Sequence, residues 1–185
     1  MKNVTKPTVW RVATYVGLAA VVAAATLFLG VASAFAAAPE QDGDNPFPNR
    51  WLERAYQREQ MALDHQSDRL EFAALIAGDV EEWIEYLKDQ GEDTGELEAA
   101  LANFNTGLAE AQAHHDDAAA ILGEHAGFDE DGKVVDRPQA IDTLRRAGRA
   151  LRDAHRALSD ATIDLHTAIR DWRYDHYPRS ERPGG

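Results

Sequence analysis

The sequence predicts an all-α fold: an elongated, antiparallel, coiled-coil-like three-helix bundle preceded by an N-terminal signal or anchor segment. In one long segment, apolar residues recur at alternating steps of four and three, which places them on one face of a helix. Two segments upstream repeat this pattern, and glycine- and proline-containing breaks separate the three segments. Because such a face can be buried only against partner helices, we expect the segments to pack together. The clearest series, called the seam of its segment, is Ala140, Leu144, Ala147, Leu151, Ala154, Leu158, Ala161, Leu165, Ala168 and Trp172.

The N-terminus has the pattern of a secretory signal peptide. Lys2, Lys6 and Arg11 precede a long uncharged run rich in alanine and valine, and small-residue cleavage patterns end at Ala34 and Ala36. We expect cleavage after one of these two residues. The rest of the chain is then exported as a secreted, periplasmic or cell-surface protein.

An uncleaved membrane anchor is the alternative, because the apolar run is long enough for residues 12–31 to span a bilayer. In both cases the basic flank stays in the cytoplasm and the rest of the chain crosses the membrane. The expected organisation is therefore a signal or anchor over 1–36, a flexible linker over 37–49, the bundle over 50–177 and a disordered tail over 178–185.

Composition argues against several classes of function. The chain of 185 residues has 19 Lys and Arg against 32 Asp and Glu, a net charge of −13, so we expect no nucleic-acid partner. It has no cysteine, which excludes disulfides, thiolate catalysis and thiol-ligated metals. We find no nucleophile motif, phosphate-binding loop or dinucleotide fingerprint, and therefore expect neither an enzyme nor a cofactor.

The first helix is expected over about 48–90, with Pro48 in its first turn and Gly91 ending it. Two of its eleven seam positions are polar. The seam residues are Leu52, Tyr56, Glu59, Leu63, Gln66, Leu70, Ala73, Ala77, Val80, Ile84 and Leu87.

The second helix is expected over about 94–125, opened by a capping box of Asp93 and Glu96. The third is expected over about 137–176, capped by Asp136 with Gln139. The second seam also has two polar positions, and it consists of Leu97, Leu101, Phe104, Leu108, Ala111, His115, Ala118, Leu122 and His125.

Short loops make neighbouring helices antiparallel, so reflection about the first turn gives a register. This register brings the polar seam residues together as two buried pairs, Glu59 with His125 and Gln66 with His115. Buried polar groups must be hydrogen-bonded, and such pairs fix the alignment of helices. The same register places Gly107 near Gly78, where we expect close helix approach or a kink. A ligand that uses the space is the alternative.

Charge supports the same packing. The second helix, with its flanks, has eight acidic residues and no Lys or Arg, whereas the third carries an arginine stripe. We expect the stripe to complement the acidic neighbour, at about a few tenths of a kcal/mol per exposed pair. The stripe is formed by Arg145, Arg149, Arg152 and Arg156.

Two places could hold a metal ion. The loop over 127–136 resembles a calcium loop, with Asp129 and Asp131 at ligand positions, but Gly127 and Pro138 occupy the first and last positions. A small hairpin around Asp131 and Gly132, whose Phe128, Val134 and Val135 cover the bundle end against Phe47 and Trp51, is the alternative we favour.

The pair His114 and His115 is the second place. Adjacent histidines on a helix diverge by about 100 degrees and cannot readily share one ion, so we favour structural roles for both. A pH-sensing role is also open, because charging His115 in an apolar layer would cost stability.

Aromatic residues gather at the bundle end near the first turn, where they either close the end or form a partner-binding patch. These residues are Trp83, Tyr86, Trp172, Tyr174 and Tyr177.

Several short segments resemble an uncharacterised family of exported, Ala/Arg-rich bacterial helical proteins, and the resemblance implies no activity and no functional residue. The arrangement is also similar to spectrin-type three-helix coiled coils, by architecture alone. The segments are Leu52-Glu53-Arg54-Ala55-Tyr56-Gln57-Arg58-Glu59-Gln60, Gly127-Phe128-Asp129, Gly132-Lys133-Val134 and Asp136-Arg137.

We therefore expect an exported, non-enzymatic bundle that is a structural or protein-interaction module of the cell envelope, with a protein partner still to be identified. One alternative is an envelope chaperone or small-ligand carrier that opens along its alanine-rich seam. Another is a metal or pH sensor based on His114, His115, His125 and Glu59.

Overall fold

The computed structural model describes residues 46–177. The predicted signal or anchor over 1–36, most of the linker over 37–49 and the tail over 178–185 lie outside the described residues. The last four residues of the predicted linker, 46–49, are already helical, because the first helix begins at Pro46.

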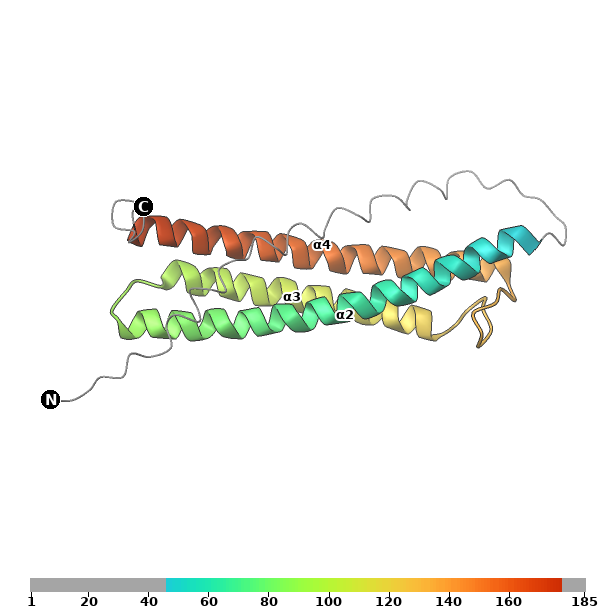
Figure 1. The fold of residues 1–185 in the computed structure, drawn as a ribbon, viewed down its shortest axis with the longest axis horizontal. Coiled ribbons are helices and arrows are strands. Elements are labelled where there is room, and N and C mark those ends of the chain that lie inside the picture. The colour runs from blue at the N-terminus through green and yellow to red at the C-terminus, as the bar shows by residue number, and fades with distance from the viewer. Residues whose placement is uncertain (1–45, 178–185) are drawn as a thin grey trace, which may run out of the picture. The chain divides into compact units, whose positions relative to one another are not determined.

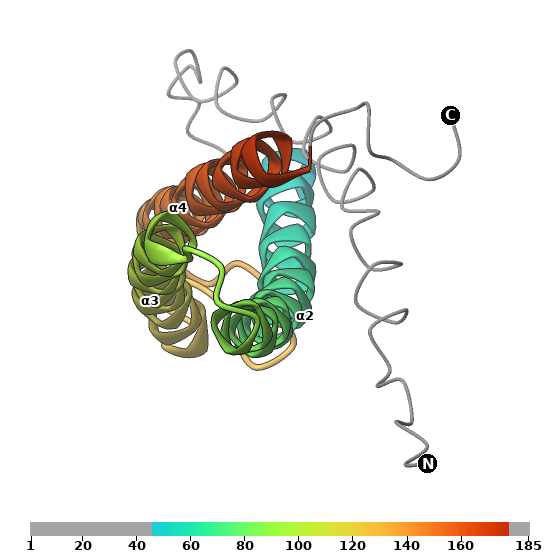
Figure 2. The same ribbon diagram turned by 90° about the vertical axis from the view of Figure 1, so that its left-hand side faces the viewer.

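The described chain is all-helical, and its three helices pack against one another, as the seams predict (Figure 1). They are α2 (Pro46–Asp89), α3 (Gly95–Gly123) and α4 (Arg137–His176). The end-on view in Figure 2 shows each helix beside the other two. At 1.5 Å per residue, α2 is about 66 Å long and α4 about 60 Å. Within residues 46–177 the only β-type pairing is an isolated bridge between Phe128 and Val134.

The three predicted seams form the core. Not one of their residues is exposed, and most are buried. The buried residues divide into two apolar clusters. One is centred on Leu70, Ile84 and Trp172, and the other on Leu52 and Tyr56, near the loop between α3 and α4. The polar seam residues Glu59 and Gln66 lie between the two clusters along α2.

The helices α3 and α4 approach each other most closely. A Cβ atom added to Gly107 would lie 2.6 Å from the Cβ atom of Ala161, so glycine is required for this approach. The predicted meeting of Gly107 with Gly78 is wrong: Gly78 is exposed and has nothing within 4 Å of an added Cβ. The small residues therefore draw α3 toward α4, while α2 packs less closely on both.

The ends of two helices differ in how well local sequence predicts them. Asp136 caps α4 as predicted, since its Oδ1 accepts a hydrogen bond from the Gln139 amide at 3.0 Å. The capping box predicted for α3 is wrong, because the helix starts at Gly95 with Thr94 as its N-cap and without a side-chain cap. The Asp93 carboxylate instead accepts the Gly95 amide hydrogen at 3.1 Å.

Within residues 46–177, neither α2, α3 nor α4 combines the length and apolarity needed to span a bilayer.

Candidate functional site

A polar layer lies between the two apolar clusters and joins all three helices. Gln66 of α2 donates from Nε2 to the carbonyl of Leu151 on α4, at 3.1 Å. Its Oε1 lies 3.4 Å from Nδ1 of His115 on α3. The His115 side chain is buried, with 8% of its surface exposed. The structure therefore brings Gln66 and His115 together. One amide satisfies a partner on each neighbouring helix, an arrangement that a shift of any helix along its axis would break.

The predicted pairing of Glu59 with His125 is replaced by other contacts. Glu59 lies on the α4 side of α2, where its Oε1 is 3.4 Å from the Cβ position of Gly148. Burial raises the pKa of the Glu59 carboxyl, and the guanidinium groups of Arg152 and Arg58 oppose this shift. Glu59 is therefore a half-buried carboxylate held beside arginines, not a histidine partner.

His125 is displaced from the second seam because α3 ends at Gly123. Its backbone has φ of 52°, in the left-handed region, and its Nδ1 lies 3.2 Å from the Tyr56 hydroxyl. That hydroxyl donates its one hydrogen to the carbonyl of Leu122 at 2.9 Å, so Nδ1 of His125 is the donor to Tyr56. Burial raises the pKa of Tyr56. The partner of His125 is thus a buried tyrosine.

A third histidine contact, which the seams do not predict, joins α2 to α4. Arg69 Nη1 lies 3.5 Å from Nδ1 of His155. Burial, and then the charge of Arg69, lower the pKa of His155. Both residues stand beside seam positions, so the seam pattern, which pairs only seam residues, gives them no partner.

The loop predicted as a calcium site or a hairpin is a hairpin. The Asp129 carboxylate accepts hydrogen bonds from the amides of Asp131 at 3.0 Å and Lys133 at 2.8 Å, and Gly132 has φ of 73°. Asp129 thus holds the turn together, whereas Asp131 is exposed.

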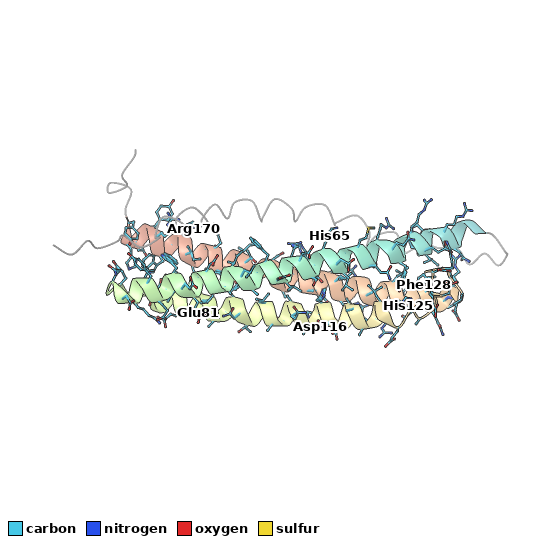
Figure 3. The ribbon with its side chains drawn as sticks, turned by 60° about the horizontal axis from the view of Figure 1, so that its bottom comes forward. His65, Glu81, Asp116, His125, Phe128 and Arg170 are labelled. Carbon is cyan, nitrogen blue, oxygen red and sulfur yellow. The ribbon has the colours of Figure 1, made fainter. Side chains whose placement is uncertain are left out.

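The hairpin covers the end of the bundle through a stacked ring pair. Phe128 stacks on Tyr56 with ring centroids 4.2 Å apart, close to His125 (Figure 3). The predicted cover by Val135 is wrong, since this side chain is exposed, and Trp51 is exposed as well. The side chain of Phe47 lies outside the described residues.

His114 and His115 point in different directions, as the helix geometry predicts. Nε2 of His114 lies 4.0 Å from Oε1 of Glu110 on its own helix, whereas His115 faces Gln66. Across residues 46–177, three or more His, Asp or Glu side chains do not gather in a way that could hold a metal ion. His115 therefore takes part in the packing of α3 on α2, whereas His114 faces a residue of its own helix.

The aromatic residues near the first turn divide into buried and exposed groups. Trp172 is 2% exposed, and its Nε1 donates to the carbonyl of Asp93 at 2.8 Å. Trp83 meets it edge-on, with ring centroids 5.4 Å apart. Trp172 is thus buried and Trp83 partly buried, and both pack at the bundle end. The exposed remainder of the predicted patch is Tyr86, Tyr174 and Tyr177.

The arginine stripe of α4 does not pair with α3. Arg152, one of its members, lies beside Glu59 of α2. Among the described residues, the arginines of α4 form ion pairs within their own helix, Arg146 with Asp142 and Arg170 with Asp171, and none with α3. The predicted complementarity between α3 and α4 is therefore wrong.

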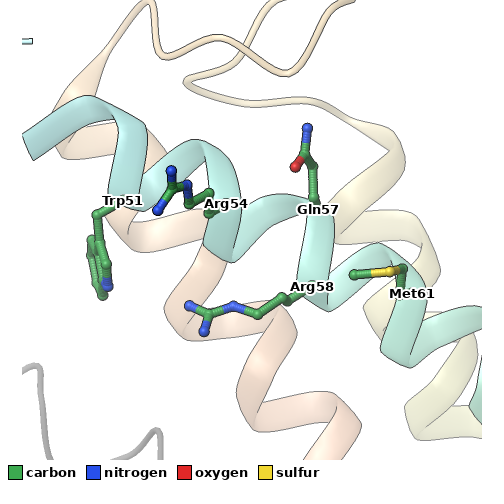
Figure 4. A pocket seen from close by; sticks show the side chains of 5 residues that line it. All are labelled: Trp51, Arg54, Gln57, Arg58 and Met61. Carbon is green, nitrogen blue, oxygen red and sulfur yellow. The ribbon is translucent and has the colours of Figure 1, made fainter. Parts of the chain in front are cut away.

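Five large exposed apolar side chains lie on the outer face of α2. Phe72 is 53% exposed and Leu75 is 63% exposed, although both lie in the middle of the helix. Nearer the start of α2, a shallow depression of about 370 Å³ lies on the same face (Figure 4). It is lined by Trp51, Arg54, Gln57, Arg58 and Met61.

Comparison with known protein families, with curated proteins and with solved structures gave no match.

Proposed function

We propose that this chain is an exported, non-enzymatic interaction module of the cell envelope, which presents the outer face of α2 to a protein partner. The export part rests on the N-terminal sequence, with its basic start, long apolar run and small-residue cleavage patterns. Anchoring through residues 12–31 is the alternative form of the same proposal.

The observation that carries the interaction part is the exposure of Phe72 and Leu75. Full burial of such a side chain contributes about 1.5–3 kcal/mol, so leaving both more than half exposed forgoes a large part of that free energy. The seam on the opposite side of α2 already supplies its contribution to the core. Clustered exposed apolar side chains on a stable monomer commonly mark an interaction surface.

In-cell photo-crosslinking tests this proposal. A photoreactive residue at Leu75 is expected to form adducts with an envelope protein in living host cells. The same residue at Ala109, an exposed position on α3, is the control and is expected to form far fewer. Equal adducts at both positions, or a chain that protease cannot reach from outside the cytoplasm, would contradict the proposal.

An envelope chaperone or small-ligand carrier is the second candidate. It is favoured by the looser packing of α2 on the other two helices, which lets α2 open more easily than the α3–α4 pair. A carrier of this kind is expected to bind a hydrophobic dye while fully folded. A passive interaction module is expected to bind the dye only when it unfolds.

A further inference from the structure

The outer face of α2 carries a second repeat of alternating three- and four-residue steps, opposite the seam. All eleven of its residues are exposed. We call this set the outer stripe. It consists of Trp51, Arg54, Arg58, Met61, His65, Asp68, Phe72, Leu75, Asp79, Glu82 and Tyr86.

The order of residue types along the outer stripe is almost the same from either end, except that the charges have opposite signs. An aromatic residue stands at each end, and a pair of charged residues lies inside it: two arginines near the start and two carboxylates near the end. Next comes one flexible apolar side chain from each direction, Met61 and Leu75. Asp68 lies at the centre.

The charges of the stripe have no ion-pair partners within the described bundle. The ion pairs of α2 in residues 46–177 involve Lys88, with Glu85 and Glu98, and Glu53, with Lys133. Arg54, Asp79 and Glu82 are outside these pairs, and Arg58 acts on Glu59 only at longer range. Complementary charges are therefore present on one helix, about 36 Å apart at 1.5 Å per residue, and cannot reach each other.

We propose that two copies of this chain associate through the outer stripe, with α2 antiparallel to α2 of the partner and a twofold axis near Asp68. Arg58 then lies level with the partner's Asp79, and Arg54 level with the partner's Glu82. Met61 meets the partner's Leu75, and Trp51 meets the partner's Tyr86. Except at the centre, where Asp68 faces its own copy, the stripe complements its own reverse, as a twofold interface requires.

Orientation and length agree with this arrangement. A parallel pairing sets arginine against arginine and carboxylate against carboxylate, which like-charge repulsion disfavours. The stripe extends about 53 Å at 1.5 Å per residue, long enough for a helix-pair interface. This inference rests on the proposed interaction role and names the partner as a second copy.

Sedimentation velocity of the purified chain provides the test, with two charge variants. One variant carries Arg54→Glu and Arg58→Glu, and the other carries Asp79→Arg and Glu82→Arg. Each alone places like charges face to face and is expected to weaken self-association by about tenfold or more. Because each variant supplies the charge that the other lacks, an equimolar mixture of the two is expected to associate again as a heterodimer.

The matched control is Arg145→Glu with Arg149→Glu, two exposed positions on α4 with the same charge change. It is expected to associate like the unmodified chain, and circular dichroism checks that every variant stays helical. The proposal is overturned if the unmodified chain is monomeric up to about 0.1 mM, or if the mixture fails to recover association.

Disulfide trapping is a second test of the twofold arrangement, and it leaves the arginines of the stripe unchanged. The chain has no cysteine, so Asp68→Cys near the twofold axis is expected to give a covalent dimer on mild oxidation, and Asp160→Cys on α4 is not. Equal trapping at both positions overturns the twofold arrangement. If self-association fails while Leu75 still crosslinks to a different envelope protein, the interaction role stands and the partner named here is wrong.

Discussion

Replacing Gly107 by alanine tests the close approach of α3 and α4. The added Cβ would lie 2.6 Å from the Cβ of Ala161 and 3.5 Å from the carbonyl oxygen of Ala157. Carbon atoms pack best at about 3.5–4.0 Å, so the two helices must separate by about 1 Å. Since Ala161 has no flexible end that could move aside, the separation is imposed on both backbones.

The magnitude follows from two opposing effects. Alanine gains about 1 kcal/mol over glycine in helix propensity, whereas overpacking costs about 1–3 kcal/mol. A Cβ–Cβ contact that no side-chain rotation can relieve belongs at the upper end of that range. We therefore expect Gly107→Ala to lower the free energy of unfolding by about 2 kcal/mol, measured by urea denaturation followed by circular dichroism.

Two further variants separate packing from propensity. Gly78→Ala makes the same change on an exposed face with nothing within 4 Å, and is expected to stabilise by about 1 kcal/mol. Combining Gly107→Ala with Ala161→Gly moves the methyl group across the interface and is expected to restore stability close to that of the original chain. A Gly107→Ala protein at least as stable as the original would refute the close-approach argument.

Three more predictions address the core, a cap and a titrating group. Leu151→Glu places a carboxylate at a 7% exposed position of α4 and is expected to abolish cooperative thermal unfolding, whereas a cooperative melt would mean that the seam is misassigned. Asp136→Ala removes the side-chain bond to the Gln139 amide and is expected to cost about 1 kcal/mol in urea denaturation; no loss would contradict the capping role. Because the folded pKa of His155 lies below its ordinary 6.5, the unfolded chain binds the proton more tightly, so this residue makes stability fall as the pH drops through 6.5. His155→Gln is expected to flatten that part of the stability profile, and an unchanged profile would assign the pH dependence to other groups.

Periodicity alone was enough to place the helices and the core, because every seam residue except His125 is helical and covered where the heptads place it. Together with reflection about the short first turn, it was also enough to bring Gln66 to His115. The same reflection failed for Glu59. A residue between two facing helices can turn toward either, and Glu59 turns toward Arg152 of α4.

The ends of the helices required chemistry that periodicity does not contain. The seam pattern continues to His125, yet α3 stops at Gly123, and the chain then passes through left-handed positions at His125 and Gly127. An added Cβ at Gly127 would collide with the backbone of Ala140, so this glycine fixes how the hairpin meets α4. A buried tyrosine hydroxyl needs a hydrogen-bond partner, but the sequence does not show which residue near this junction is the partner of Tyr56.

The two faces of α2 differ in composition, and this difference indicates whether association through the outer stripe is reversible or obligate. The seam is mostly apolar and buried, so the bundle has a complete core without any partner. The outer stripe mixes charged and apolar side chains, whereas obligate interfaces resemble an apolar core cut in half. A folded monomer that pairs reversibly follows from this composition. Burial of Met61, Phe72 and Leu75 supplies most of the affinity, while the arginines and carboxylates select the antiparallel orientation.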